Sequence, residues 1–366
     1  MYKIAITPHW EVARAGSEPF DTAVLLRLLL AIDSFGSIAQ AAKAVGLSYR
    51  YAWGLLREAE QVFGSALLAT GRGRGTALTP VAEKLIWADR RIEARLSPLL
   101  DSLASELQNE LKRTLTGPAS ALRLDASHGF AVAALLGHLH AADIAVELRY
   151  RNSSDALAAL AHNECDFAGF HVPLGEFEEA AVAHYLRWLN PATHCLMLLA
   201  ERNIGLFVER GNPKGIRGLA DLARRDVQFV NRQAGSGTRM MLELMLKKLG
   251  IAPAAISGFD SAELTHSAVA AFIASGMGDV GIGVETAARH FGLDFILLSP
   301  ERYFFALPQA ALETPLVAQV THLLQSRAVR ADIDALAGYD STGTGGILTL
   351  QEAFGTPQKA RIRPAR

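Results

Sequence analysis

Arginine, serine and threonine side chains cluster at a short glycine-rich turn, where together they could hold a small anion. The turn has the sequence Arg232-Gln233-Ala234-Gly235-Ser236-Gly237-Thr238-Arg239, between an extended segment at 227–231 and a helical segment at 240–250. Glycines let backbone N–H groups turn toward a ligand, and a helix N-terminus adds a favourable dipole. The alternative is a capped strand-to-helix turn that binds nothing.

Other polar side chains stand where the remaining predicted strands end. From residue 118 on, extended and helical segments alternate, which favours a parallel sheet with ligand groups at the carboxyl ends of its strands. Hydroxyl groups, backbone N–H groups and arginines at such an edge suit a small oxyanion or a carboxylate. The candidate ligand-binding residues are Ser127, His128, Ser153, Ser154, His171, Arg232, Ser236, Gly237, Thr238, Arg239 and Glu285. His128 and His171 are equally consistent with buried core histidines.

The sequence shows no pattern of catalytic or metal-ligating residues around these groups. The turn at 232–239 lacks the Lys-Ser/Thr pair of a nucleotide-binding P-loop, and it does not have the order of a nucleophile elbow. No His, Cys and carboxylate cluster has metal-ligand spacing, and Cys165 and Cys195 are too few for a disulfide framework. We therefore expect a binding protein that is not an enzyme and has no cofactor or metal.

A second group of residues could bind a nucleic acid. Residues 36–60 predict two short helices joined by a tight turn at Gly46. Ser48 stands at the N-cap position of the second helix. The candidate DNA-binding side chains on this helix are Ser48, Tyr49, Arg50, Tyr51 and Trp53. A helix that begins with such residues can contact phosphates and base edges from its first turn. The alternative is a helical hairpin whose aromatic residues fill a core.

Further cations follow the predicted recognition helix. Glycines alternate with Arg72 and Arg74 between two short extended runs, which is typical of a hairpin tip. In a winged helix-turn-helix, such a tip lies against the sugar-phosphate backbone or in the minor groove; a solvated turn is the alternative. Residues 1–117 carry 14 Lys+Arg against 12 Asp+Glu, a modest positive excess in a chain of formal net charge -1.

A long helix is predicted from Pro80 to about Arg113, with an apolar stripe and a kink or break at Pro98. A stripe of this length needs a partner. Pairing of two copies would set two recognition helices about one DNA turn apart, as dimeric proteins that bind near-palindromic sites require. We therefore expect a homodimer on a double-stranded DNA operator, with a tetramer as a further option. The alternative is that the stripe packs on the C-terminal domain of its own chain.

The 366 residues are too many for one simple core, so several domains are expected. The predicted division is residues 1–80 for a DNA-binding domain, 81–116 for the linker and dimerisation helix, 117–350 for a two-lobed ligand-binding domain, and 351–366 for a C-terminal tail. Within the third part, residues 195–199 and 205–208 are predicted as separate strands and 215–223 as a helix. Neither a secretory signal nor an apolar run of membrane length is present, so we expect a soluble, cytoplasmic protein without membrane contact.

The N-terminal region resembles the winged helix-turn-helix of the ModE family of molybdate-responsive regulators and, more distantly, LysR-type regulators. The resemblance is carried by AIDSFGSIAQAAKAVGLSYRYAWGLLREAE, then LLAT, the glycine-rich tip and LTPVAEKLI. It implies that Ser48, Tyr49, Arg50 and Trp53 belong to the recognition helix and that Arg72 and Arg74 lie on the wing.

Residues 118 to about 350 depart from ModE, which carries small barrel-like oxyanion domains. They resemble instead a PBP-like domain of the periplasmic-binding-protein type, through NSSDALAALAHNECDFAGFHVP, FVNRQAGSGTRMMLE and ELTHSAVAAFIASGMGDVGIG among other segments. The resemblance implies an α/β fold of type II with two lobes, and a regulator tied to molybdenum or tungsten metabolism whose effector is molybdate or tungstate. A regulator that senses a small organic acid is an alternative. A cofactor-handling protein or enzyme of molybdenum cofactor metabolism, using the same cleft, is another.

Overall fold

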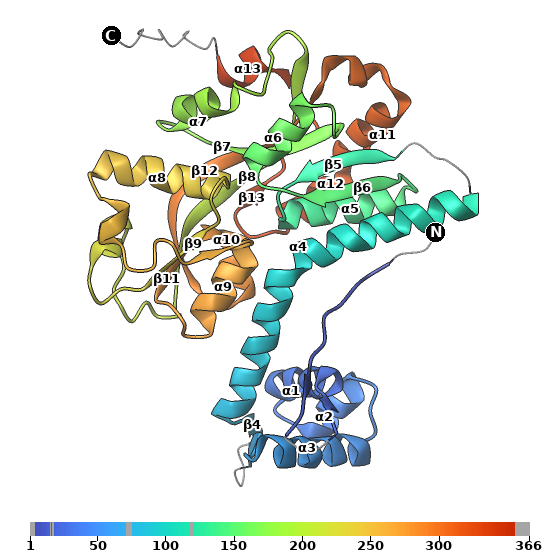
Figure 1. Ribbon diagram of the computed structural model, residues 1–366, viewed down its shortest axis with the longest axis vertical. Helices are drawn as coiled ribbons and strands as arrows, with labels where there is room; N and C mark the ends of the chain where they lie inside the picture. The colour runs from blue at the N-terminus through green and yellow to red at the C-terminus, as the bar shows by residue number, and fades with distance from the viewer. Residues whose placement is uncertain (1–3, 15, 17, 71–74, 117–120, 356–366) are drawn as a thin grey trace. The chain divides into compact units, whose positions relative to one another are not determined.

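The computed structural model describes residues 4–14, 16, 18–70, 75–116 and 121–355. Its contacts divide the chain into two compact units (Figure 1). The N-terminal unit is Thr7–Ser97, and the C-terminal unit is Pro98–Arg366 together with Met1–Ile6. The boundary therefore falls at Pro98, inside the long helix, where the sequence predicted a kink or break.

The N-terminal unit is a winged helix-turn-helix, as the sequence predicted. Its elements are β1 (Glu11–Val12), β2 (Phe20–Asp21), α1 (Ala23–Phe35), α2 (Ile38–Ala44), α3 (Tyr49–Phe63), β3 (Leu68–Thr70) and β4 (Thr76–Leu78). Strands β3 and β4 pair antiparallel as the two sides of the wing. Gly36 ends α1 with φ 61°, a left-handed conformation that suits glycine, and Ser37 then caps α2. The core is built from small and branched apolar side chains, with Leu28, Leu29 and Ala52 among those fully buried.

Helix α4 (Pro80–Thr116) runs through the unit boundary with Pro98 inside it. In the C-terminal unit, its small and polar face covers the edge strand β6 (Val146–Tyr150). The Asn109 amide donates to the carbonyl oxygen of Val146 at 2.6 Å, and the Ser105 hydroxyl both donates to that oxygen and accepts from the N–H of Leu148. Helix side chains thus satisfy backbone groups that a further strand would otherwise pair.

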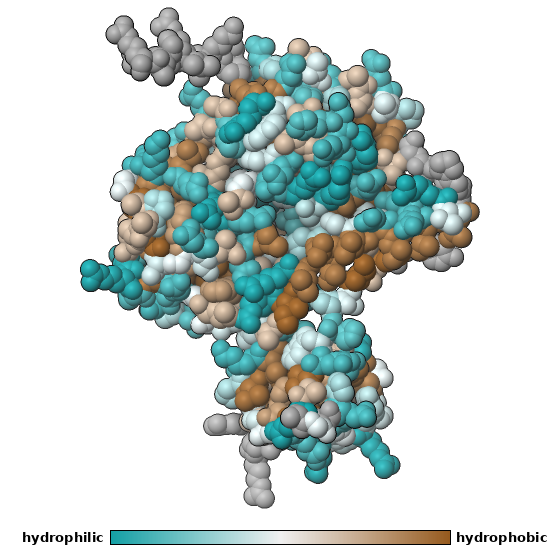
Figure 2. All heavy atoms as spheres, in the orientation of Figure 1, coloured by the Kyte–Doolittle hydropathy of each residue, from teal (hydrophilic) through white to brown (hydrophobic). Residues whose placement is uncertain are grey.

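The opposite face of α4 is apolar and exposed. Figure 2 shows apolar side chains gathered along this helix. They include Leu99, Leu103, Leu107, Leu111 and Leu115, whose exposed fractions lie between 41% and 62%. We call these five residues the leucine strip. The exposure of these five leucines in the single chain leaves an apolar face that a partner could cover.

The C-terminal unit is built on a sheet of ten strands with the central order β10-β9-β11-β8-β12-β7-β5-β6. The first lobe contains β5 (Leu122–Ala126), α5 (Phe130–Ala141), β6, α6 (Ser153–Ala161), β7 (Phe167–Pro173) and α7 (Glu178–Tyr185). The second lobe contains η1 (Leu219–Ala223), β9 (Phe229–Arg232), α8 (Gly237–Leu249), η2 (Pro253–Ala255), β10 (Ala262–Glu263), α9 (His266–Ala274), β11 (Val280–Val284) and α10 (Glu285–His290). Each lobe has its own buried apolar core.

Two long antiparallel strands, β8 (His194–Val208) and β12 (Asp294–Pro308), pass through both lobes. The sequence prediction was wrong to divide β8 into two strands, and only a 3-10 turn, η1, lies in the predicted helix at 215–223. The chain then closes on the first lobe through η3 (Gln309–Glu313), α11 (Pro315–Leu324), α12 (Arg327–Asp334), β13 (Tyr339–Asp340), β14 (Ile347–Thr349) and α13 (Leu350–Phe354). The sequence prediction placed Ala353 in the C-terminal tail, but the side chain of this residue is buried.

Candidate functional site

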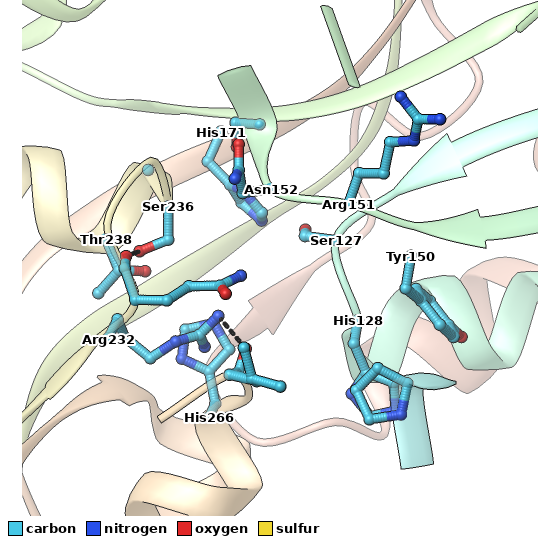
Figure 3. Close-up of a pocket in the computed structure, with 15 residues that line it drawn as sticks. Ser127, His128, Tyr150, Arg151, Asn152, His171, Arg232, Ser236, Thr238 and His266 are labelled. Atoms are coloured by element: carbon cyan, nitrogen blue, oxygen red, sulfur yellow. Dashed lines mark hydrogen bonds between the residues drawn. The ribbon is translucent and has the colours of Figure 1, made fainter. Parts of the chain in front are cut away.

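A cavity of about 130 Å³ lies in the C-terminal unit where segments of both lobes meet (Figure 3). The first lobe contributes residues that follow β5 and β6, together with His171 of β7, and the second contributes residues that follow β9 and β10. The lining residues are Pro98, Ser127, His128, Tyr150, Arg151, Asn152, Ser153, His171, Arg232, Gln233, Ser236, Gly237, Thr238, Leu264 and His266. The strand ends thus gather polar groups at one edge, as expected for an α/β sheet.

Several helices begin at this cavity. Asn152 caps α6, Ser236 caps α8 and Thr265 caps α9, each with a side-chain oxygen that accepts a backbone N–H of the first turn. Helix α5 begins just after His128, and its N-cap, Gly129, has no side chain to accept such a bond. Because each helix carries partial positive charge at its N-terminus, their combined field favours a negative charge in the cavity.

Arg232 is the most unusual cation of the cavity. Its side chain is 4% exposed, and its Nη2 donates to the carbonyl oxygen of Leu264 at 2.8 Å. Among the described residues, its Nε and Nη1 have no hydrogen-bond partner, and no carboxylate forms an ion pair with it. Burial, with a further contribution from the charge of Arg202, lowers the pKa of Arg232 to about 9. A buried guanidinium without a counter-ion is costly, and an anion in the cavity would remove that cost.

A buried ion pair lies behind the cavity wall. Arg202 of β8 donates from Nε and Nη2 to Glu301 Oε1 of β12, at 2.7 and 2.6 Å. The same Nη2 lies 3.4 Å from Nε2 of His266, which must accept because a guanidinium only donates. Burial and the arginine charges hold the pKa values of His171 and His266 well below the ordinary value. Both histidines are therefore neutral at neutral pH.

Most of the predicted ligand-binding residues line the cavity, and three do not. Those that line it are Ser127, His128, Ser153, His171, Arg232, Ser236, Gly237 and Thr238. The Ser154 hydroxyl lies 3.2 Å from Nε2 of His184, and Arg239 pairs with Glu243 at 2.9 Å. Glu285 accepts from the Asn203 amide and pairs with Arg289. These three side chains satisfy their polar groups away from the cavity.

The sequence prediction missed several lining residues, most of which are neighbours of predicted ones. They are Pro98, Tyr150, Arg151, Asn152, Gln233, Leu264 and His266. The positive charge of Arg151 is already compensated, because its Nε lies 3.1 Å from Oδ2 of the buried Asp125. A usable signal existed for His266, since Thr265 marks the start of a helix just as Ser236 does.

Three residues of helix α4 line the cavity or contact its wall. Pro98 lines it, and Asp101 lies 3.6 Å from Nε2 of His128. The Ser102 hydroxyl accepts the backbone N–H of Tyr150 at 3.2 Å, and the Tyr150 ring packs edge-on against His128. The helix that enters the C-terminal unit is therefore bonded directly to two residues of the cavity wall.

The predicted recognition helix, α3, presents its polar residues to solvent. The Ser48 hydroxyl accepts the N–H of Tyr51 at 3.1 Å, which confirms the predicted cap. Tyr49 and Tyr51 are 53% and 54% exposed, and Arg50 is exposed beside them. The Trp53 indole donates to the Tyr49 hydroxyl, and the half-buried Trp53 ring also packs against the core of the N-terminal unit. Arg72 and Arg74, predicted on the wing, lie outside the described residues.

The described part of the chain holds neither a candidate metal site nor a candidate membrane span. Those residues contain no group of three or more His, Cys, Asp or Glu side chains placed to hold a metal ion. In the same residues, no helix combines the length and the apolar character needed to cross a membrane.

Comparison with known proteins identifies the two parts of the chain. Residues 136–325 match the PBP superfamily domain, and residues 24–83 match the bacterial regulatory helix-turn-helix proteins of the lysR family. The uncharacterized protein YvgK of Bacillus subtilis (strain 168) is 33% identical over 200 residues, which cover 55% of this chain and 64% of that protein. The molybdenum-pterin-binding protein MopB of Rhodobacter capsulatus is 34% identical over 143 residues, 38% of this chain and 49% of that protein.

Among solved structures, the chain is similar to a mutant of OxyR from Corynebacterium glutamicum, with 16% sequence identity and a TM-score of 0.43. The match covers 86% of this chain and 94% of the OxyR chain. The helix-turn-helix family that residues 24–83 match is one of transcriptional regulators and not of enzymes. This agrees with the expectation from the sequence. The chain therefore belongs to the PBP superfamily domain family and joins that domain to a DNA-binding helix-turn-helix of the lysR family.

Proposed function

We propose that this protein is a transcriptional regulator whose binding to an operator is controlled by a small anion held in the cavity. The observation that carries the proposal is Arg232, a buried cation at the cavity with two nitrogen atoms that no described residue engages. A buried polar group without a partner costs about 1–3 kcal/mol, and more when it is charged. A bound anion would supply the missing hydrogen bonds and the missing charge.

The remaining lining also suits an anion. The N-termini of α6, α8 and α9 contribute positive partial charge, and the hydroxyls of Ser127, Ser153 and Thr238 can donate hydrogen bonds. The cavity is small, so an inorganic oxyanion or a short carboxylate suits it better than a nucleotide. Among the described residues that line the cavity, none carries a carboxylate that would repel such a guest.

Molybdate or tungstate is our preferred effector. The hydroxyl-rich lining supports a tetrahedral oxyanion, and one relative of the chain is named as a molybdenum-pterin-binding protein. The resemblance of the N-terminal domain to ModE points the same way. A small organic acid would use Arg232 equally well. A protein that handles molybdenum cofactor would use the same cavity without binding an operator, so DNA binding separates that alternative from our proposal.

The mechanism we propose couples lobe closure to α4. Residues of both lobes surround the cavity, so an anion that contacts both would favour a closed arrangement. Pro98, Asp101 and Ser102 connect the cavity wall to the helix that leads to the DNA-binding unit. The anion can shift this equilibrium only through its different affinities for the open and closed forms.

Homodimerisation through the leucine strip is part of the same proposal. Five leucines with 41% to 62% exposure along one helix form an apolar surface that a second copy would cover. Pairing would present two α3 helices to the half-sites of a near-palindromic operator. A tetramer would need a further interface.

The leucine strip can be tested by sedimentation of the full chain. Replacing Leu107→Lys should convert a dimer into a monomer, because a charge would be buried at the centre of the interface. Leu249→Lys is the matched control, since Leu249 is 54% exposed on α8, away from the strip. A Leu107→Lys protein that stays dimeric while remaining folded would rule out this interface.

Anion binding itself can be tested by thermal unfolding of the full chain with molybdate, tungstate, sulfate, phosphate and short carboxylates. A ligand that binds only the folded state raises the midpoint in a concentration-dependent manner. We expect at least one of these anions to do so, with molybdate and tungstate foremost. If no anion in the series stabilises the protein, the cavity is not an anion site.

A further inference from the structure

The charges around the cavity nearly balance before any ligand is bound. Arg202 is paired with Glu301, and Arg151 with Asp125, which also accepts from Arg149 at 3.0 Å. Arg151 has a second acidic neighbour, Glu164, whose carboxylate lies 3.5 Å from Nη1. At the rim, His128 faces Asp101. Arg232 therefore remains as the cation without a paired carboxylate among the described residues that line the cavity.

Arg232 supplies a single positive charge. The register of β9 and β10 sets Glu263 across from Arg232, but this glutamate does not line the cavity. Arg202 and Glu301 are charged groups whose fields shift the pKa of Arg232, the first lowering it and the second raising it. The histidines add no charge in the empty protein, because burial and the arginines keep them neutral. A guest with two negative charges would thus leave one of them uncompensated in a largely buried site.

We propose that the cavity holds one net negative charge: a singly charged anion binds as it is, and a doubly charged one binds together with a proton that His171 takes up. This inference rests on the proposed function, because it concerns the same site, and it names the charge class of the ligand. It also identifies His171 as a specificity-determining residue. Molybdate and tungstate are doubly charged and would bind by the second route.

His171 is placed to take the proton. Its Nδ1 lies 3.4 Å from the Ser153 hydroxyl at the start of α6, and its Nε2 has no hydrogen-bond partner among the described residues. That Nε2 lies 4.0 Å from Oε1 of Glu301, whose Oε2 is also without a partner in the same part of the chain. An imidazolium here would face the carboxylate on one side and the cavity on the other.

The groups that face His171 come from every element packed around it. They are Ser153 of α6, Tyr185 of α7, Gly237 of α8, Arg202 of β8, Arg232 of β9, His266 of α9, and Glu301 and Tyr303 of β12. The two arginines oppose protonation while the cavity is empty. Glu301 and an anion would oppose the arginines once the cavity is filled. His266 is less suitable, because its Nε2 already accepts from Arg202.

The sign of the resulting pH dependence follows from linkage. The pKa of His171 is depressed in the empty protein, and a doubly charged anion raises it, so binding consumes a proton. The affinity for such an anion should then fall as pH rises, by up to about tenfold per pH unit for one proton. Arg232, with a pKa of about 9, is charged over this range and adds little below about pH 8.

Tungstate and perrhenate provide the test, because both are tetrahedral but perrhenate carries one charge less. The experiment is isothermal titration calorimetry of the full chain between about pH 7 and about pH 8, in two buffers of different ionisation enthalpy. The difference between the binding enthalpies in the two buffers gives the number of protons taken up. We expect uptake approaching one proton for tungstate, with weaker binding at higher pH. For perrhenate we expect uptake near zero and an affinity that does not change with pH.

Two variants assign the proton. His171→Gln should abolish the proton uptake that accompanies tungstate binding, whereas His184→Gln, at a histidine that contacts Ser154 away from the cavity, should keep it. If tungstate binds without a proton, or perrhenate binds with one, this inference is wrong, although the cavity is still an anion-binding site. If neither tungstate nor perrhenate binds, and the other anions also fail, the proposed function itself is wrong. Even if His171→Gln does not fold, the comparison of the two anions on the unaltered protein shows whether a doubly charged anion binds together with a proton.

Discussion

The face of α3 and the cavity of the C-terminal unit use cations in opposite ways. Arg50 on α3 is exposed beside two half-exposed tyrosines, whereas Arg232 is 4% exposed with two unengaged nitrogen atoms. An exposed cation is hydrated and screened by salt, so it contributes little until many act together on a polyanion. A buried one is poorly hydrated and can be compensated by a single small anion. The exposed cations of α3 therefore suit a large polyanion that binds in a salt-dependent manner. The buried cation of the cavity suits a small, enclosed anion.

The largest effect should come from Arg232→Gln. We expect anion affinity to fall by about 30-fold to 5,000-fold, the range for losing one partner of a buried charge pair (about 2–5 kcal/mol). The empty variant should be no less stable than the unaltered protein, because an uncompensated buried charge has been removed. Titration calorimetry and thermal unfolding measure the two quantities.

Arg239→Gln is the matched control for that variant. Arg239 lies in the first turn of α8, at the other end of the glycine-rich turn, but it pairs with Glu243 and its guanidinium lies over the ring of Phe259. It should leave anion affinity unchanged. Equal losses of anion affinity in the two variants would show that the cavity does not distinguish Arg232 from an arginine that is already paired with a carboxylate.

The next effect should come from Arg50→Ala at the DNA-facing surface. Operator affinity should fall by about 5-fold to 150-fold, which corresponds to about 1–3 kcal/mol for a base contact. If Arg50 contacts a phosphate, affinity should fall for all sequences and the salt slope should decrease by about one. Fluorescence anisotropy at several salt concentrations separates the two cases. Anion affinity should not change, and a loss of anion binding here would contradict the division of labour between the two sites.

The smallest effect should come from Ser236→Ala. The Ser236 hydroxyl caps α8 at the cavity, so its removal should lower stability by about 1 kcal/mol and weaken anion binding by a few fold. Ser326→Ala removes the equivalent cap of α12, far along the chain from the cavity residues. Both variants should lose similar stability in denaturant titrations, but only Ser236→Ala should weaken anion binding. An unchanged anion affinity in Ser236→Ala would exclude its hydroxyl from the site.

The same comparison explains what the sequence could predict. The α3 surface depends on neighbouring residues, and Ser48 marks the start of the helix by a local capping signal. The cavity depends on which strands lie side by side, so the sequence could place its residues only approximately. Ser153 lines the cavity and Ser154 does not, because adjacent positions on a helix point about 100° apart.

Other differences have the same long-range origin. His266 was missed because its contact with Arg202 joins β8 to α9. The continuity of β8 was missed because pairing with β12 along its length, and not a local pattern, extends the strand through Arg202 and Asn203. The fold of both units followed from local periodicity and from the family resemblance, whereas the charge balance of the cavity required the structure.

Operator affinity measured with and without anion shows whether occupation of the cavity controls DNA binding. The titration would use the full chain, a duplex from its own promoter region at fixed ionic strength, and tungstate at a saturating concentration. We predict a change in operator affinity that is present in Arg239→Gln and absent in Arg232→Gln. An operator affinity that is the same with and without a bound anion would mean that occupation of the cavity does not control DNA binding.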